Sequence, residues 1–244
     1  MKTIRNVGKI KIINEIGDGI GRRVASDFLD RLIVTFAKQS TKYIRSISDA
    51  PFAYRERQLH SIFAPAISTI TDSFLMEYPI ERKWDEERKK DWNDYTGWLD
   101  YWCRYRNIDF FIELKHNYDS YKNDEIRKDT FANWDYMNNT QLEIVKNEAK
   151  RHSEFCKGVL LVSLQVVTIY DKMQTTKIPQ SCGDVDTLVS TQKNYFENLN
   201  PKPNWSGLWM LNDDIYDLSS REYDTQTEYY PGVMLIAKVC KIIK

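Results

Sequence analysis

Several features are scarce in this chain of 244 residues, and each scarcity excludes a class of protein. Nine glycines and seven prolines, with no repeat of either, exclude collagen-like and low-complexity disordered chains. The four cysteines lie dozens of residues apart, and the three histidines share no helical or strand spacing, so we expect neither a zinc site nor a dense disulfide framework. No long apolar run occurs, so we expect no signal peptide and no membrane span, and we place the chain in the cytoplasm.

Charge of one sign is also lacking. Thirty-five Lys and Arg balance thirty-five Asp and Glu, which gives a formal net charge of zero. A polyanionic partner must therefore be bound by a local basic patch and not by the field of the whole protein. The densest basic stretch is the charged connection at residues 81–95, and its cations could hold phosphates, although several acids share this loop and a solvated mixed-charge loop is an open alternative. These cations are Arg82, Lys83, Arg88, Lys89 and Lys90.

Hydrophobic periodicity predicts alternating helices and strands. Apolar residues recur at helical spacing over 21–44, 59–70, 130–153 and 184–198. Strand-like runs cover 9–14, 73–80, 97–105, 108–115, 158–170, 205–211 and 233–243. Only Arg106 and Asn107 separate two of these runs, which is the length of a tight antiparallel hairpin. The sequence thus predicts an α/β fold with a mixed central sheet flanked by helices.

Acidic and basic side chains are placed on this hairpin in a pattern that suggests chemistry. In the run 108–115 the even positions are apolar, so Glu113 and Lys115 project together from the opposite face. On the preceding strand the even positions from Trp98 to Arg104 share one face, and if the hairpin register permits, Asp100 lies near Glu113. Two close carboxylates repel each other unless a cation lies between them, and oxygen ligands suit Mg²⁺. A solvated sheet face with a cross-strand salt bridge is the alternative.

The arrangement Asp100, twelve intervening residues, then Glu113-Leu114-Lys115 resembles the PD-(D/E)xK nuclease superfamily, whose fold is restriction-endonuclease-like. The resemblance covers roughly residues 52–170. Leu99 stands where the family pattern has proline. The Glu-x-Lys tripeptide also occurs elsewhere in the chain, and only this copy closes a strict strand alternation after a hairpin.

The resemblance implies particular roles for these residues. Asp100, Glu113 and the backbone carbonyl of Leu114 are implied as ligands of Mg²⁺ or Mn²⁺, and Lys115 is implied as a catalytic residue. Glu56 is a further candidate metal ligand, although an acid at a helix N-terminus is also favoured by the helix dipole. Gln141 is a possible auxiliary residue, with an ordinary surface position as its alternative.

The resemblance predicts a metal-dependent nuclease that hydrolyses the phosphodiester bonds of DNA, in restriction, phage defence or repair. Cutting both strands of a duplex requires two sites, so a homodimer is a further expectation. We expect residues 1–50 to form an N-terminal strand–helix appendage and 51–244 to form the nuclease-like domain with C-terminal strands. The alternative is a catalytically silent scaffold that binds nucleic acid or a protein partner, because a fold does not dictate activity.

Overall fold

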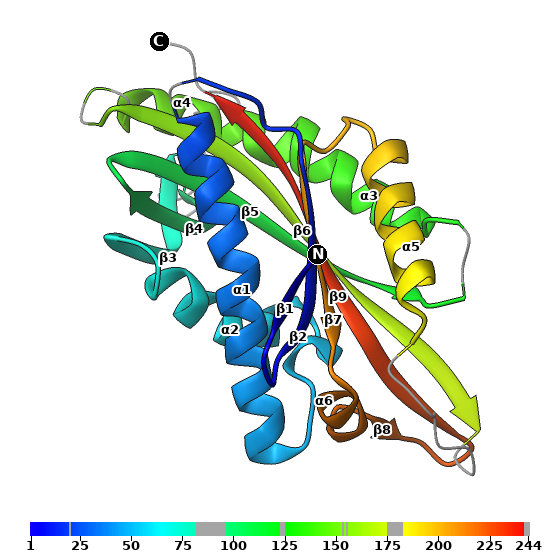
Figure 1. The fold of residues 1–244 in the computed structure, drawn as a ribbon. Helices are drawn as coiled ribbons and strands as arrows, with labels where there is room; N and C mark the ends of the chain where they lie inside the picture. The colour runs from blue at the N-terminus through cyan, green and yellow to red at the C-terminus, as the bar shows by residue number, and fades with distance from the viewer. Residues whose placement is uncertain are drawn as a thin grey trace.

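A large mixed β-sheet with helices on both faces organises the protein (Figure 1). The computed structural model describes residues 1–19, 21–81, 96–122, 125–152, 154, 156–174 and 183–241. Within these residues the strands are β1 (Lys2–Ile4), β2 (Gly8–Asn14), β3 (Ser73–Glu81), β4 (Thr96–Tyr105), β5 (Ile108–Ser120), β6 (Gly158–Gln174), β7 (Trp205–Leu211), β8 (Arg221–Glu222) and β9 (Gln226–Lys241). The α/β fold with a mixed sheet flanked by helices, expected from the sequence, is confirmed.

The strands follow the order β1-β2-β7-β9-β6-β5-β4-β3, and β8 pairs with β9 outside this path. The strands β5 and β6 run parallel, whereas the other paired strands run antiparallel. The strand β6 lies in the middle of the sheet between β5 and β9, and its residues from Val159 to Ile169 are buried. A run rich in Val, Leu and Ile is typical of a strand that is buried on both faces of a sheet.

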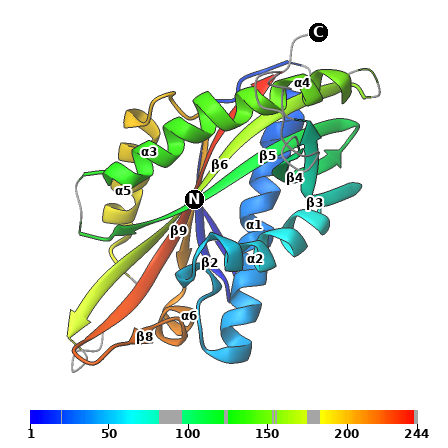
Figure 2. The same cartoon turned by 180° about the vertical axis from the view of Figure 1, so that it is seen from behind.

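The helices form two layers. On one face, α1 (Arg22–Ile47) and α2 (Glu56–Ser68) pack with the 3₁₀ turn η1 (Pro51–Ala53) and with α6 (Asp213–Leu218). On the other face lie α3 (Lys128–Tyr136), α4 (Leu142–His152) and α5 (Val185–Asn198), as Figure 2 shows from behind. None of the described helices is both long and apolar enough to cross a membrane.

The segment 1–50, expected as an N-terminal appendage, contributes β1, β2 and α1 to this architecture. The strand β2 pairs with β7 along its whole length, from Gly8 opposite Leu211 to Asn14 opposite Trp205. The apolar face of α1 belongs to the same buried cluster as the side chains of α2. The N-terminal segment is thus continuous with the sheet and with its core.

The tight hairpin between β4 and β5 is confirmed. Arg106 and Asn107 have φ values of 50° and 61°, which is the left-handed conformation that a two-residue hairpin turn requires. The prediction that β5 ends near Lys115 is wrong, because β5 continues to Ser120 while paired with β6. Hydrogen bonds to a neighbouring strand extend it past the regular apolar alternation.

The single helix predicted over 130–153 is also wrong. A π-helical turn, η3 (Met137–Gln141), separates α3 from α4. Within it the Asn138 side chain donates a hydrogen bond of 2.8 Å to the carbonyl of Trp134. Asparagine side chains compete in this way with backbone hydrogen bonds, and π-turns occur frequently near functional sites. The turn places Gln141 over the sheet.

Candidate functional site

The candidate site lies where β4 and β5 stop pairing. Their register ends with Tyr101 opposite Ile112, whereas β5 continues to Ser120 and stays paired with β6 on its other side. Beyond Ile112, no strand in the described part of the chain pairs with this edge of β5. Backbone groups on that edge need partners from side chains or solvent.

The strand β4 loses its regular alternation at Asp100. Leu99 packs on the α4 side of the sheet, whereas Tyr101 packs on the α2 side, although residues two apart on a regular strand share a face. On β3, Glu77 has a φ of 51°, which is uncommon for a residue with a side chain. The prediction that the even positions from Trp98 to Arg104 share one face is therefore wrong, because β4 changes its facing at Asp100.

Two carboxylates bind the unpaired edge of β5. Asp100 Oδ2 accepts a hydrogen bond of 2.7 Å from the backbone N–H of Leu114. Glu56, the first residue of α2, accepts one of 3.1 Å at Oε2 from the backbone N–H of His116. Asp100 and Glu56 thus replace the missing strand at alternate residues of β5.

Glu113 lies beside this edge and is only 4% exposed. Burial, followed by the charge of Asp100 and a hydrogen bond with it, raises the pKa of Glu113 to about 9, and Lys115 opposes this rise. Gln141 Nε2 lies 3.4 Å from Glu113 Oε2. At neutral pH the protonated form of Glu113 is therefore favoured while no further cation is present.

Lys115 is the cation of the site. Its Nζ lies 3.4 Å from Glu56 Oε1 and donates a hydrogen bond of 3.0 Å to the carbonyl oxygen of Leu114. The Lys115 side chain is 18% exposed, so the ammonium group is largely sheltered from solvent. It thus lies at the same edge of β5 that Asp100 and Glu56 cover.

The structure brings together most of the residues singled out from the sequence. Asp100, Glu113, Lys115, Glu56 and Gln141 contact one another directly or through β5. The predicted phosphate-binding cations of the loop 81–95 lie outside the described residues.

The binding of Asp100 and Glu56 to backbone amides of β5 was not predictable from the sequence pattern. Alternation along a strand indicates which side chains share a face, but it does not show where a partner strand stops pairing. No pattern in the sequence marks the residue at which β4 stops pairing with β5.

The donors at this edge include carboxylate and carbonyl oxygens, which are the ligand type that Mg²⁺ takes. Among the described residues, no group of three or more His, Cys, Asp and Glu side chains is arranged to hold a metal ion. Mg²⁺, however, keeps several of its waters and is commonly held by one or two carboxylates. Asp100, Glu113 and the carbonyl oxygen of Leu114 fit that requirement, and the raised pKa of Glu113 indicates a position where a cation would relieve repulsion.

Comparison of the chain with protein-family models, with curated proteins and with solved structures gives no match.

Proposed function

We propose that this chain is a Mg²⁺- or Mn²⁺-dependent nuclease that hydrolyses phosphodiester bonds of DNA on a restriction-endonuclease-like domain. The observation that carries the proposal is the pairing of Asp100 with Glu113. These two acids come from different strands, meet where the strands diverge, and lie beside Lys115. Repulsion between buried acids opposes folding, so such an arrangement suggests a cation-dependent role.

The arrangement of elements around the site supports the proposal. A helix, α2, precedes an antiparallel meander of β3, β4 and β5, and the helical layer of α3 and α4 leads to β6, which is parallel to β5. This is the order expected from the resemblance to PD-(D/E)xK nucleases. The acids and the lysine occupy the positions on β4 and β5 that the motif implies.

The residues of the site can be given separate chemical roles. A bound divalent ion would activate a water molecule and neutralise charge that develops on the phosphate. Asp100, the ionised form of Glu113 and the carbonyl of Leu114 would hold that ion. Lys115 carries a sheltered ammonium group that can donate hydrogen bonds to the attacking water or to a phosphate oxygen.

One observation favours the silent scaffold as a second candidate. Asp100 and Glu56 already accept hydrogen bonds from β5, and Lys115 is paired with Glu56 and with a backbone carbonyl. These contacts satisfy much of the site without a metal. A scaffold that binds nucleic acid or protein would need nothing more from these residues.

Metal titration and cleavage assays on the full chain separate the two candidates. Because a ligand that binds only the native state raises the melting temperature, millimolar Mg²⁺ or Mn²⁺ should raise it for a nuclease. The cleavage substrates are plasmid, linear duplex, single-stranded DNA and RNA, each with and without the divalent ion. We expect cleavage of DNA that requires the ion, and sedimentation in the presence of duplex tests the expected homodimer.

A matched pair of variants controls this experiment. Glu113→Gln removes a proposed ligand charge at nearly constant volume and should abolish both the metal-induced shift and cleavage. Glu148→Gln changes the acid of another Glu-x-Lys tripeptide, on α4, and should leave both unchanged. If the wild type shows neither a shift nor cleavage, or if Glu113→Gln retains both, the nuclease assignment is rejected and the scaffold is favoured.

A further inference from the structure

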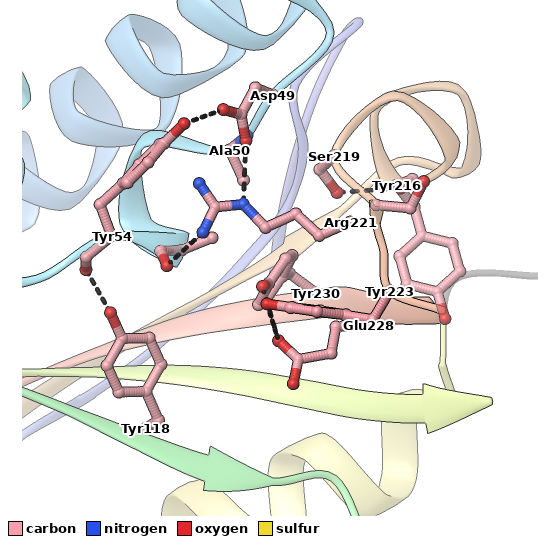
Figure 3. A network of polar contacts seen from close by, with 12 residues as sticks. Asp49, Ala50, Tyr54, Tyr118, Tyr216, Ser219, Arg221, Tyr223, Glu228 and Tyr230 are labelled. Carbon is pink, nitrogen blue, oxygen red and sulfur yellow. Dashed lines mark hydrogen bonds and ion pairs between the residues drawn. The ribbon is translucent and has the colours of Figure 1, made fainter. Parts of the chain in front are cut away.

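Three distant side chains hold the segment that leads into α2. The backbone carbonyls of residues 52–54 each accept a hydrogen bond from a different strand. The carbonyl of Phe52 accepts a hydrogen bond of 2.8 Å from Thr168 Oγ1 on β6. The carbonyl of Ala53 accepts one of 2.9 Å from Arg221 Nη1 on β8, and the carbonyl of Tyr54 accepts one from the hydroxyl of Tyr118 on β5. Figure 3 shows the contacts of Arg221 and Tyr118 with this segment.

Arg221 also fixes the side chains on either side of this segment. Its Nε lies 3.2 Å from Asp49 Oδ1, and its guanidinium carbon lies 3.8 Å from the centroid of the Tyr54 ring. The Tyr54 hydroxyl in turn donates to Asp49, so these three side chains form a closed set of contacts. The Arg221 side chain is 22% exposed, which limits the screening of its contacts by water.

Thr168 extends the same set of contacts to β5. Because its hydroxyl donates to the backbone carbonyl of Phe52, the Thr168 oxygen accepts a hydrogen bond of 2.9 Å from the Nε2–H of His116. Burial lowers the pKa of His116 to about 4, so the ring is neutral at physiological pH and carries its single proton on Nε2. The side chain of His116 thus helps to hold this segment, while its backbone N–H binds Glu56.

The position of Glu56 depends on this segment. The helix α2 begins at Glu56 and has no side-chain hydrogen bond at its N-cap, Arg55. Its first residue is therefore not fixed by the helix alone. The Glu56 side chain is 34% exposed, yet both of its oxygens have partners on β5. Anchoring of the backbone carbonyls of residues 52–54 explains how the Glu56 carboxylate stays against β5.

We propose that Tyr118, Thr168 and Arg221 are positioning residues that hold the carboxylate of Glu56 against the open edge of β5, beside Lys115. The role of this carboxylate toward a divalent ion rests on the proposed function. Its placement on the His116 amide does not.

The test uses the full chain with Tyr118→Phe, which removes one hydroxyl, and Arg221→Lys, which keeps the charge but loses the planar contact with Tyr54. The first measurement is amide hydrogen exchange without metal. Loss of an anchoring hydrogen bond should speed exchange of the His116 amide by about three- to tenfold. The Leu114 amide, which binds Asp100 on the same edge, should stay unchanged and controls for general destabilisation.

Tyr230→Phe is the matched control variant. Tyr230 belongs to the same polar cluster, but its hydroxyl donates a hydrogen bond of 3.0 Å to Glu228 and not to the segment before α2 (Figure 3). This variant should leave the exchange of both amides unchanged. If Tyr118→Phe and Arg221→Lys do not speed His116 exchange, or speed that of Leu114 equally, the positioning role is rejected.

The second measurement is the dissociation constant of Mn²⁺, obtained from the melting temperature against metal concentration. Loss of a residue that orients a metal-site group typically weakens affinity by roughly 10- to 100-fold. Tyr118→Phe should weaken Mn²⁺ affinity by this factor in the wild type. In the Glu56→Gln background it should not change the affinity further, because its influence passes through Glu56. Equal effects in both backgrounds would overturn the proposal.

The two measurements separate this inference from the proposed function. If the wild type does not respond to Mn²⁺ while Tyr118→Phe still speeds His116 exchange, the nuclease proposal fails and the positioning role stands. If the wild type binds Mn²⁺ and neither the exchange nor the affinity changes in Tyr118→Phe, only the positioning role fails.

Discussion

Among the buried carboxylates of β5, Asp109 near the start of the strand and Glu113 near its middle have opposite surroundings. Asp109 is fully buried and accepts hydrogen bonds of 2.6 Å from Nε and 3.0 Å from Nη2 of the Arg104 guanidinium. His152 Nδ1 lies 3.3 Å from the same carboxylate, and Tyr78 binds the other ring nitrogen. The charge of Asp109 is neutralised inside the protein.

No arginine in the part of the chain that the structure describes is paired with Glu113. Its close neighbours are the carboxyl of Asp100 and the amide of Gln141, and its pKa is raised to about 9. A buried acid that is paired contributes to structure, whereas a buried acid beside another acid needs a proton or an external cation. The comparison therefore supports a structural role for Asp109 and the proposed functional role for Glu113.

The largest expected effect is on activity, at the cation beside Glu113. Lys115→Met should lower Mg²⁺-dependent cleavage by about a hundredfold or more, because a donor aimed at developing charge is lost. Its partner Glu56 is partly exposed, so the free energy of unfolding should change by less than about 1 kcal/mol. Single-turnover cleavage and urea unfolding measure the two quantities. A large loss of stability would contradict a functional role for this lysine.

The matching change at Asp109 should have the reverse outcome. Arg104→Met leaves a fully buried carboxylate without its main partner, which costs about 3 kcal/mol or more of the free energy of unfolding. Urea unfolding measures this loss. Below the melting temperature, cleavage by the folded fraction should be close to wild type. If Arg104→Met is as stable as wild type, Asp109 is not the structural acid of the pair.

The pH dependence of stability should follow Glu113. Its pKa rises from 4.5 to about 9 on folding, so the folded protein binds more protons than the unfolded chain between these values. The stabilising contribution is fully present below pH 4.5 and is lost as the pH rises toward 9. Metal binding at neutral pH should correspondingly release a proton.

Two measurements check this dependence. In Glu113→Gln the decline in stability between these pH values should be smaller than in wild type, as measured by urea unfolding across that range. Calorimetric titration of Mn²⁺ in buffers of different ionisation enthalpy should detect the released proton in wild type. Equal slopes in the two proteins would show that Glu113 titrates normally.

The smallest expected effect concerns the backbone contact of Asp100. Asp100→Ala removes the acceptor of the Leu114 amide and should lower the free energy of unfolding by about 1 kcal/mol. Asp100→Asn keeps a carbonyl oxygen there and should be more stable than the alanine variant, while both lose cleavage. Thermal unfolding of the two variants provides the measurement, and equal stabilities would show that the hydrogen bond contributes little.

Short-range patterns predicted much of this architecture. The two residues Arg106 and Asn107 indicated a tight turn, and the alternation on β5 indicated that Glu113 and Lys115 lie close together. The π-turn before α4 and the change of facing at Asp100 were not predictable in this way. Each depends on competing contacts, with the Asn138 side chain in one case and with both neighbouring strands in the other.

The amino-acid sequence by itself determined the mixed α/β class, the hairpin and the proximity of Glu113 to Lys115, because these follow from periodicity over a few residues. The tertiary structure decided that β4 leaves β5 at Ile112, that Glu56 reaches the resulting edge, and that Arg221 anchors the segment before it. Such contacts join residues far apart in the chain. Local propensity cannot specify them, since they depend on how all the strands pair at once.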